Sequence, residues 1–246
     1  MASLRERARR GERLIGGLLR MPAEELVEMS AVAGMDFVLI DCEHGPADIL
    51  ALRQHLAVAA LHDVPVIVRV GEDDAGQILR VLDQGAEGIL APHIDSAADA
   101  ERLVSASLYP PAGTRGFATY SRAGRFGRTP PEEHRRRFLE NTLVLGMIES
   151  PAAVAAVEEI VRTARLDGIM IGPADLAAAS GPEDPPVAES TAAVNEVLRR
   201  AGLLRMDIVG NVEAARRSFD DGAQLVVYNL ASSLMAHLEG LVGGRP

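Results

Sequence analysis

The sequence predicts a single (β/α)8 barrel, the TIM-barrel fold of the α/β class, over residues 1–246. Eight short apolar segments alternate with eight amphipathic segments along the whole chain, at a spacing of roughly 25 residues. Buried parallel strands are apolar on both faces, and strict strand–helix alternation is typical of this barrel. The first apolar segment lacks the G-x-G-x-x-G of a doubly wound sheet. No linker or shift in composition divides the chain, so we expect one domain.

The apolar segments are the expected strands. In chain order they span 14–19, 37–41, 64–70, 87–92, 143–149, 167–172, 206–210 and 224–229. The expected helices lie between them, at 22–34, 47–60, 74–85, 96–107, 151–164, 189–202, 212–222 and 232–243.

Several helix boundaries carry their own signals. Ser150 before Pro151 is typical of a capped first turn, and Asn211 can cap the helix that follows it. Glycine favours the left-handed conformation that ends helices. We therefore expect helices to stop at Gly34, Gly85, Gly202 and Gly222.

Residues 109–140 interrupt this regular spacing. The fourth and fifth strands start about 55 residues apart, and the surplus is rich in Pro, Gly and Arg and ends in an expected extra helix. It is either a solvated connection or a loop that covers a site, including a site on a neighbouring subunit. Arg115, Arg122, Arg125 and Arg128 on this loop would attract carboxylates.

Composition excludes several functions. The net charge of −10 argues against nucleic acid and anionic membranes as partners, and no apolar run approaches a membrane span. All 25 basic residues are arginine, which excludes a Schiff-base lysine and a Walker-A loop. The charged N-terminus lacks the apolar stretch of a signal peptide, and the single cysteine suits a reducing compartment, so we expect a cytoplasmic protein.

In a barrel of this kind, chemistry is located where the strands end. Ionisable and polar side chains gather at those points of the sequence. They are Asp41, Glu43, His44, Arg69, His93, Glu149, Asp175 and Asn229. So many ionisable groups beside a packed barrel indicate a functional site.

Residue types suggest the roles. Glu149 and Asp175 offer hard oxygen ligands for Mg²⁺, which Mn²⁺ or Co²⁺ can replace, and such a metal would stabilise the enolate of a 2-oxo acid. Arg69 would add a positive charge beside the same oxygen. His44 is the expected proton carrier, with Asp41 orienting its ring.

The turn Gly172-Pro173-Ala174-Asp175 can aim the N–H groups of Ala174 and Asp175 at a substrate carboxylate.

Each of these residues also has a purely structural interpretation. Glu149 could cap a helix or form a salt bridge, Asp175 could be an N-cap, Arg69 could serve only as an ion-pair partner, and His44 could be a loop residue. Cys42 is expected to be a small buried residue. Four further histidines are expected at the surface, His55, His62, His134 and His237.

The motifs together resemble a known family. IDCEHGPAD, YPPAGTRG, MIESPAAV and DGIMIGPADLAAASG, in this order and spacing, are similar to the HpcH/HpaI aldolases, over about residues 14–235. These are class II pyruvate aldolases, such as 4-hydroxy-2-oxoheptanedioate aldolase and 2-dehydro-3-deoxyglucarate aldolase, with a barrel of the phosphoenolpyruvate/pyruvate-superfamily type.

The resemblance implies an activity and a site. It implies reversible cleavage of a 4-hydroxy-2-oxo acid to pyruvate and an aldehyde through a metal-bound pyruvate enolate, with Mg²⁺, Mn²⁺ or Co²⁺ and no nucleotide cofactor. It implies metal binding by Glu149 and Asp175, catalysis by His44, Asp41 and Arg69, and substrate binding by Arg69 and residues 172–175. It also implies a homo-oligomer, a hexamer or trimer, whose last helix packs on a neighbouring subunit.

Two departures concern the aldehyde half of the site. Met147 stands where many members have glutamine, and the segment 16–22 has leucine and arginine where many members have tryptophan. Oxaloacetate decarboxylation, or a carbon–carbon bond-forming synthase reaction on the same enolate, remains an alternative. The acyl-CoA lyases of the wider superfamily are disfavoured, because no basic N-terminal nucleotide-binding segment is visible. A non-catalytic oxo-acid binder is disfavoured by the intact set of site residues.

Overall fold

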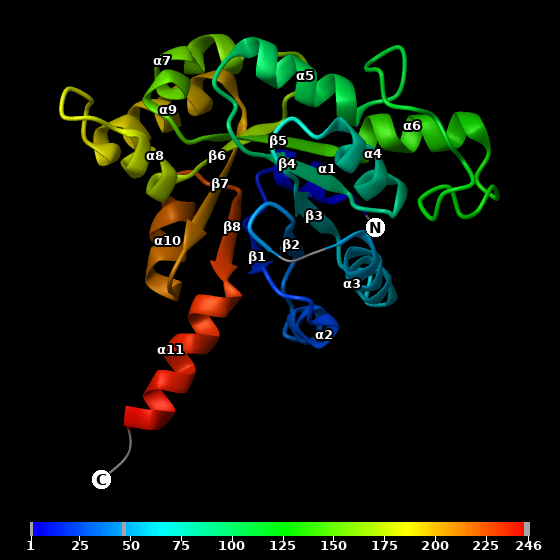
Figure 1. Ribbon diagram of the computed structural model, residues 1–246, viewed down its shortest axis with the longest axis horizontal. Helices are drawn as coiled ribbons and strands as arrows, with labels where there is room; N and C mark the ends of the chain where they lie inside the picture. Colours follow the sequence, from blue (N-terminus) through cyan, green and yellow to red (C-terminus); the bar gives the residue numbers. More distant parts are fainter. Residues whose placement is uncertain (1, 46–47, 244–246) are drawn as a thin grey trace.

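A computed structural model describes residues 2–45 and 48–243 of the chain (Figure 1). Its eight strands are all parallel and close into a barrel in chain order, which confirms the predicted (β/α)8 fold. The strands are β1 (Leu14–Leu19), β2 (Phe37–Asp41), β3 (Val66–Arg69), β4 (Gly88–Ala91), β5 (Leu143–Ile148), β6 (Gly168–Ile171), β7 (Leu204–Val209) and β8 (Leu225–Asn229). Strand β7 starts two residues before the expected 206, and β3 begins two residues after the expected 64.

Helices lie between consecutive strands and bury their apolar faces against the outside of the barrel. The expected ones are α2 (Glu24–Val32), α3 (Ile49–Leu61), α4 (Ala75–Asp83), α5 (Ala97–Ser107), α7 (Pro151–Ile160), α9 (Val187–Ala201) and α10 (Val212–Asp220). The expected last helix, α11 (Leu230–Gly243), follows β8. The predicted caps are confirmed, since Ser150 accepts from the Ala153 N–H and Asn211 from the Ala214 N–H. The four predicted helix-stopping glycines all have positive φ.

Two apolar layers make up the core. One fills the space between the strands and the surrounding helices, and the other fills the barrel itself, where Leu18, Leu39, Ile67 and Met147 are buried. Alternate residues of a strand point to opposite faces, so these four mark the inward-facing positions of their strands.

Helix α1 (Leu4–Arg9) was not expected from the sequence. It lies at the amino ends of the strands, where Leu4 and Ala8 join the core of the barrel interior. The Arg5 Nε donates to the buried carboxylate of Asp167 at 2.9 Å, and Arg9 reaches the same oxygen at 2.6 Å. A charged N-terminal segment therefore closes one end of the barrel.

The insertion between β4 and β5 ends in the expected extra helix, α6 (Pro131–Asn141). Arg115 was predicted to attract carboxylates, and the carboxylate that it contacts is internal to the chain. Its guanidinium is buried between the rings of Tyr109 and Phe138, at 4.5 and 4.4 Å, and donates to Asp83 at 2.5 Å. The Arg122 Nη1 donates to a backbone carbonyl, whereas Arg125 and Arg128 are exposed.

Helix α11 differs from the other helices, because it extends away from the barrel in Figure 1. None of its described residues is buried, and its exposed apolar side chains include Leu234, Leu238 and Leu241. Among the described residues, no helix is long and apolar enough to cross a membrane.

Candidate active site at the carboxyl ends of the strands

The inward-facing columns of the barrel end in charged side chains. Each of the four core residues Leu18, Leu39, Ile67 and Met147 is followed two positions later by an ionisable residue on the same face. These residues are Arg20, Asp41, Arg69 and Glu149. These charged residues form the rim of the barrel, which is the edge at the carboxyl ends of the strands, directly above its apolar interior.

Asp41 lies at the centre of this group and is fully buried. Arg69 donates to both of its oxygens, Nε to Oδ1 at 2.9 Å and Nη2 to Oδ2 at 2.5 Å, and the Arg20 Nε donates to Oδ2 at 2.7 Å. Burial acts to raise the pKa of Asp41, but the hydrogen bonds and charge of Arg69, with help from Arg20, lower it to about 2. Asp41 is therefore a permanent anion that fixes two guanidinium groups.

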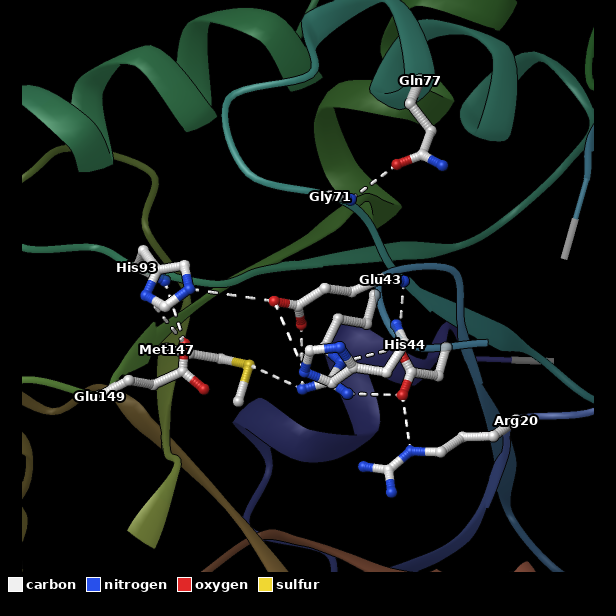
Figure 2. Close-up of polar contacts among 10 residues, drawn as sticks. Arg20, Glu43, His44, Gly71, Gln77, His93, Met147 and Glu149 are labelled. Atoms are coloured by element: carbon white, nitrogen blue, oxygen red, sulfur yellow. Dashed lines mark hydrogen bonds and ion pairs between the residues drawn. The ribbon is translucent and has the colours of Figure 1, made fainter. Parts of the chain in front are cut away.

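Arg69 is buried and faces three carboxylates. Its Nη1 lies 3.1 Å from Glu43 Oε2 and 3.9 Å from the Met147 sulfur (Figure 2). Burial acts to lower the pKa of Arg69, but hydrogen bonding to Asp41 and the charges of Asp41, Glu43 and Glu149 raise it. The structural interpretation of Arg69 as an ion-pair residue holds, and the same contacts hold its charge at the rim.

The expectation that Asp41 orients the ring of His44 is wrong. Asp41 Oδ1 accepts from the backbone N–H groups of Glu43, at 3.1 Å, and His44, at 3.2 Å, because its other positions are occupied by the two arginines. The carboxylate next to the ring is Glu43, whose Oε1 lies 3.9 Å from His44 Nε2. The His44 side chain is 57% exposed, so its ring is open to the mouth of the barrel.

Glu149 is the buried carboxylate of β5. Its Oε2 accepts from the His93 N–H at 3.1 Å and lies 3.7 Å from the His93 Nδ1. Burial raises the pKa of Glu149, and the negative charges of Asp175 and Glu43 raise it further, against the opposing effect of His93. Gly172 is required beside it, because a Cβ there would lie 2.5 Å from Glu149 Oε1.

The predicted turn 172–175 forms the start of a short helix, α8 (Pro173–Ala179). Gly172 is the N-cap and no side chain caps the helix, so the alternative of Asp175 as N-cap is wrong. Ala174 and Asp175 belong to the first turn, where backbone N–H groups have no partner within the helix. The exposed Asp175 carboxylate is close enough to Glu149 for its charge to raise the Glu149 pKa.

Comparisons with known proteins agree with this geometry. The model of the HpcH/HpaI aldolase/citrate lyase family matches residues 19–237. A pyruvate aldolase of Rhizobium etli is 36% identical, over 81% of this chain and 78% of its own length. A hydroxypyruvate/pyruvate aldolase of Pseudomonas aeruginosa is 34% identical, over 98% of this chain and 91% of its own length. The crystal structure of the citrate synthase SbnG is 26% identical, covers 98% of this chain and 96% of its own, and superposes with a TM-score of 0.87.

The chain belongs to the HpcH/HpaI aldolase/citrate lyase family. The predicted family is thereby confirmed, and the protein is a lyase. The family and the names of the relatives support the predicted class II pyruvate aldolase function, and they imply a divalent metal ion.

The residues of this HpcH/HpaI family member fit a divalent cation in their chemistry. Glu149 and Asp175 are hard oxygen donors of like charge. Burial is the main cause of the raised Glu149 pKa and the charge of Asp175 adds to it, and a cation near both carboxylates would relieve that repulsion. Within residues 2–45 and 48–243, no cluster of three or more His, Cys, Asp or Glu side chains could hold a metal alone. Water or substrate oxygens would therefore complete the coordination, as is usual for Mg²⁺.

Two members of this site have no role predicted from the sequence, although Glu43 is among the residues expected where the strands end. Glu43 contacts Arg69 and lies 3.9–4.0 Å from the rings of His44 and His93 (Figure 2). Arg20 was missed, although its position two residues after the inward-facing Leu18 is a signal that could have found it.

Two of the histidines expected at the surface are buried, and that prediction is wrong for them. His55 accepts from the Ala23 N–H at 3.0 Å, and His134 lies 3.0 Å from the Tyr109 hydroxyl. His55 belongs to α3 and His134 to α6.

Proposed function

We propose that this lyase reversibly cleaves a 4-hydroxy-2-oxo acid to pyruvate and an aldehyde, with Glu149, Asp175, Arg69 and His44 as its working groups. The observation that carries this proposal is the buried Arg69 guanidinium, which Asp41 holds at two points on the rim that also carries Glu149. A fixed cation beside a pair of carboxylates suits a reaction in which negative charge develops on an oxygen.

Glu149 and Asp175 would hold the divalent cation, which we propose to be Mg²⁺, Mn²⁺ or Co²⁺. When bound, such an ion supplies Lewis-acid polarisation of the 2-oxo acid. The N–H groups of Ala174 and Asp175 would donate to the substrate carboxylate, and Gly172 and Pro173 set the backbone that presents them.

Arg69 and His44 would act on the reacting atoms. Arg69 stabilises the enolate oxygen of pyruvate, since its charge is buried and pre-oriented by Asp41. His44 moves the proton, since its exposed ring can reach a substrate in the mouth and an imidazole can both accept and donate a proton. Asp41 is then a positioning residue for Arg69 and for the backbone of the His44 loop.

Two measurements test this function. NMR should detect exchange of the pyruvate methyl protons with deuterium in the presence of Mg²⁺ or Mn²⁺, and a panel of 4-hydroxy-2-oxo acids coupled to pyruvate detection should reveal cleavage. Exchange without metal after exhaustive chelation, or no exchange at all, would contradict the proposal.

A second candidate is decarboxylation of oxaloacetate or a bond-forming synthase reaction at the same enolate. The observation that favours it is the similarity to the citrate synthase SbnG, a protein named for bond formation. The products separate the two candidates. Pyruvate from oxaloacetate, with no cleavage of any hydroxy-oxo acid in the panel, would favour the second.

We also propose a homo-oligomer, a hexamer or trimer, in which α11 packs on a neighbouring subunit. The support is the exposed apolar row Leu234, Leu238 and Leu241 on a helix that extends from the barrel (Figure 1). Light scattering at micromolar concentration should give a multiple of the chain mass of 26.1 kDa, and a monomer would refute the proposal. A cytoplasmic location remains a prediction that rests on the single cysteine.

A further inference from the structure

Arg20 follows β1 directly and is the second arginine bound to Asp41. Its Nε donates to Asp41 Oδ2 at 2.7 Å, the same oxygen that Arg69 Nη2 contacts at 2.5 Å. The two guanidinium groups are therefore held side by side. They differ in exposure, because the Arg20 side chain is 35% exposed and that of Arg69 is 6% exposed.

The outer nitrogens of Arg20 are unused. Within the described part of the chain, no acceptor contacts its Nη1 or Nη2, and Figure 2 shows a single contact, from its Nε. An arginine anchored through Nε keeps its Nη1–Nη2 edge, which presents two parallel N–H groups to a carboxylate. Asp41 therefore fixes the orientation of the Arg20 guanidinium and leaves its Nη1 and Nη2 groups available to bind a ligand.

The two arginines share Asp41, whereas Glu43, the second carboxylate that balances their charge, contacts only Arg69 of the two. Asp41 carries one negative charge and contacts two cations, and the Glu43 contact is to the Arg69 Nη1. Among the described residues, Arg20 therefore has one carboxylate contact, through its Nε, and its half-buried guanidinium has no carboxylate of its own.

The closed strand order sets Arg20 apart from the cation-binding carboxylates. Arg20 follows β1, whereas Glu149 and Asp175 follow β5 and β6, which lie across the barrel from β1 in an eight-stranded ring. If the 2-oxo acid end of a substrate lies at Glu149 and Asp175 and its enolate oxygen lies at Arg69, the remaining part of the substrate lies toward β1 and Arg20.

We propose that Arg20 binds a carboxylate on the aldehyde half of the substrate. This inference rests on the proposed function and extends it to a substrate class, namely 4-hydroxy-2-oxo acids with a second acid group at the far end. Arg20 is then a specificity-determining residue, and Asp41 orients one arginine for the enolate and another for the distal carboxylate.

The test compares matched acceptors in the aldol addition of pyruvate by the Mg²⁺-loaded protein. Succinic semialdehyde is paired with its methyl ester, and glyceraldehyde 3-phosphate with glyceraldehyde, and the readout is the ratio of kcat/KM within each pair. We expect the wild type to favour the carboxylate by about 10-fold or more, and Arg20→Gln to lower that ratio about 10- to 100-fold. Arg20→Lys should give an intermediate ratio.

Arg162→Gln is the matched control, since this exposed arginine follows α7, away from the rim, and the ratio should not change. A wild-type ratio near one, or an unchanged ratio in Arg20→Gln, would overturn the inference and leave Arg20 as a partner of Asp41 alone. A preference confined to the phosphate pair would overturn the assignment of a carboxylate. If Arg20→Gln does not fold, two other measurements test the role of Arg20. The kcat/KM ratio of Arg20→Lys should be intermediate, and the wild-type ratio should fall toward one in high salt.

Pyruvate methyl exchange separates this inference from the function on which it rests, because exchange needs no acceptor. Absent exchange in the wild type contradicts the aldolase function itself. Normal exchange without preference for the charged acceptor contradicts only the role of Arg20.

Discussion

The two ends of the barrel contain the same ionic arrangement, a buried aspartate held by two arginines. At the carboxyl end, Asp41 accepts from Arg69 and Arg20. At the amino end, Asp167 accepts from Arg5 and Arg9, and also from the Val144 N–H at 3.0 Å.

The ends differ in what surrounds these ions. Helix α1 covers Asp167, and the Arg5 Nη1 donates onward to the Glu140 carbonyl. The Asp41 group instead opens to the mouth, where Glu43 contacts Arg69, the His44 ring is exposed and Arg20 keeps a free edge. At the amino end, where the ions are covered, this arrangement stabilises the fold. At the carboxyl end, where hydrogen-bond donors of the arginines remain free, the same arrangement can bind a substrate.

The largest expected effect is at the open end, in the carboxylates that would hold the cation. Glu149→Ala or Asp175→Ala should abolish turnover and metal binding, because one remaining carboxylate is a poor Mg²⁺ site. Chelation by EDTA should do the same, with recovery on adding Mg²⁺, Mn²⁺ or Co²⁺. Turnover and calorimetric metal titration are the measurements, with Glu159→Ala on the exposed face of α7 as control. Full activity after exhaustive chelation would contradict this assignment.

His44→Ala should slow exchange of the pyruvate methyl protons by about 10²- to 10⁴-fold, the usual effect of losing a general base. Decarboxylation of oxaloacetate should be less affected, because it reaches the enolate without removing a C–H proton. Both rates are measured at saturating Mg²⁺. Equal damage to the two reactions would show that His44 is not the base.

Asp167→Asn tests the covered end. Two arginines lose their partner, so the free energy of unfolding should fall by about 3–5 kcal/mol, as measured by urea denaturation. The kcat of the remaining folded protein should stay at the wild-type value. A fall in kcat comparable with that of a rim variant would break the proposed distinction between the two ends.

Arg69→Ala should lower kcat in both aldol cleavage and oxaloacetate decarboxylation, by roughly 3–4 kcal/mol in activation free energy, since both reactions place charge on the same oxygen. Steady-state kinetics of the two reactions provide the check. If this variant left both rates nearly intact, Arg69 would be an ion-pair residue in the same sense as Arg5.

The smallest expected effect is a pH dependence of stability at the open end. The pKa of Asp41 is lowered from 3.8 to about 2 in the folded protein, so its contribution of about 2 kcal/mol is present above pH 3.8 and lost as the pH falls toward 2. Urea unfolding of the wild type and Asp41→Asn should therefore differ more at pH 5 than near pH 2. A pH-independent difference would show that Asp41 is not held as an anion.

The fold could be predicted from local patterns. Strands β1 and β2 have the predicted bounds, because a run of apolar residues buried on both faces is visible without knowing its neighbours. Helix caps such as Ser150 and Asn211 act on N–H groups three residues away, so their signal is also local. The strand ends then indicated Asp41, Arg69 and Glu149 as rim residues.

The pairing among those residues was decided only by the tertiary structure. Sequence proximity suggested Asp41 for the His44 ring, but Arg69, from the next strand, and Arg20 take its oxygens, which leaves Glu43 at the ring. Helix α1 was missed because its charged residues are matched by Asp167, far along the chain, and the burial of Arg115 was not predicted because its aromatic partners come from different elements. A charged residue shows in the sequence that it needs a partner, but which partner it finds depends on distances that only the closed barrel sets.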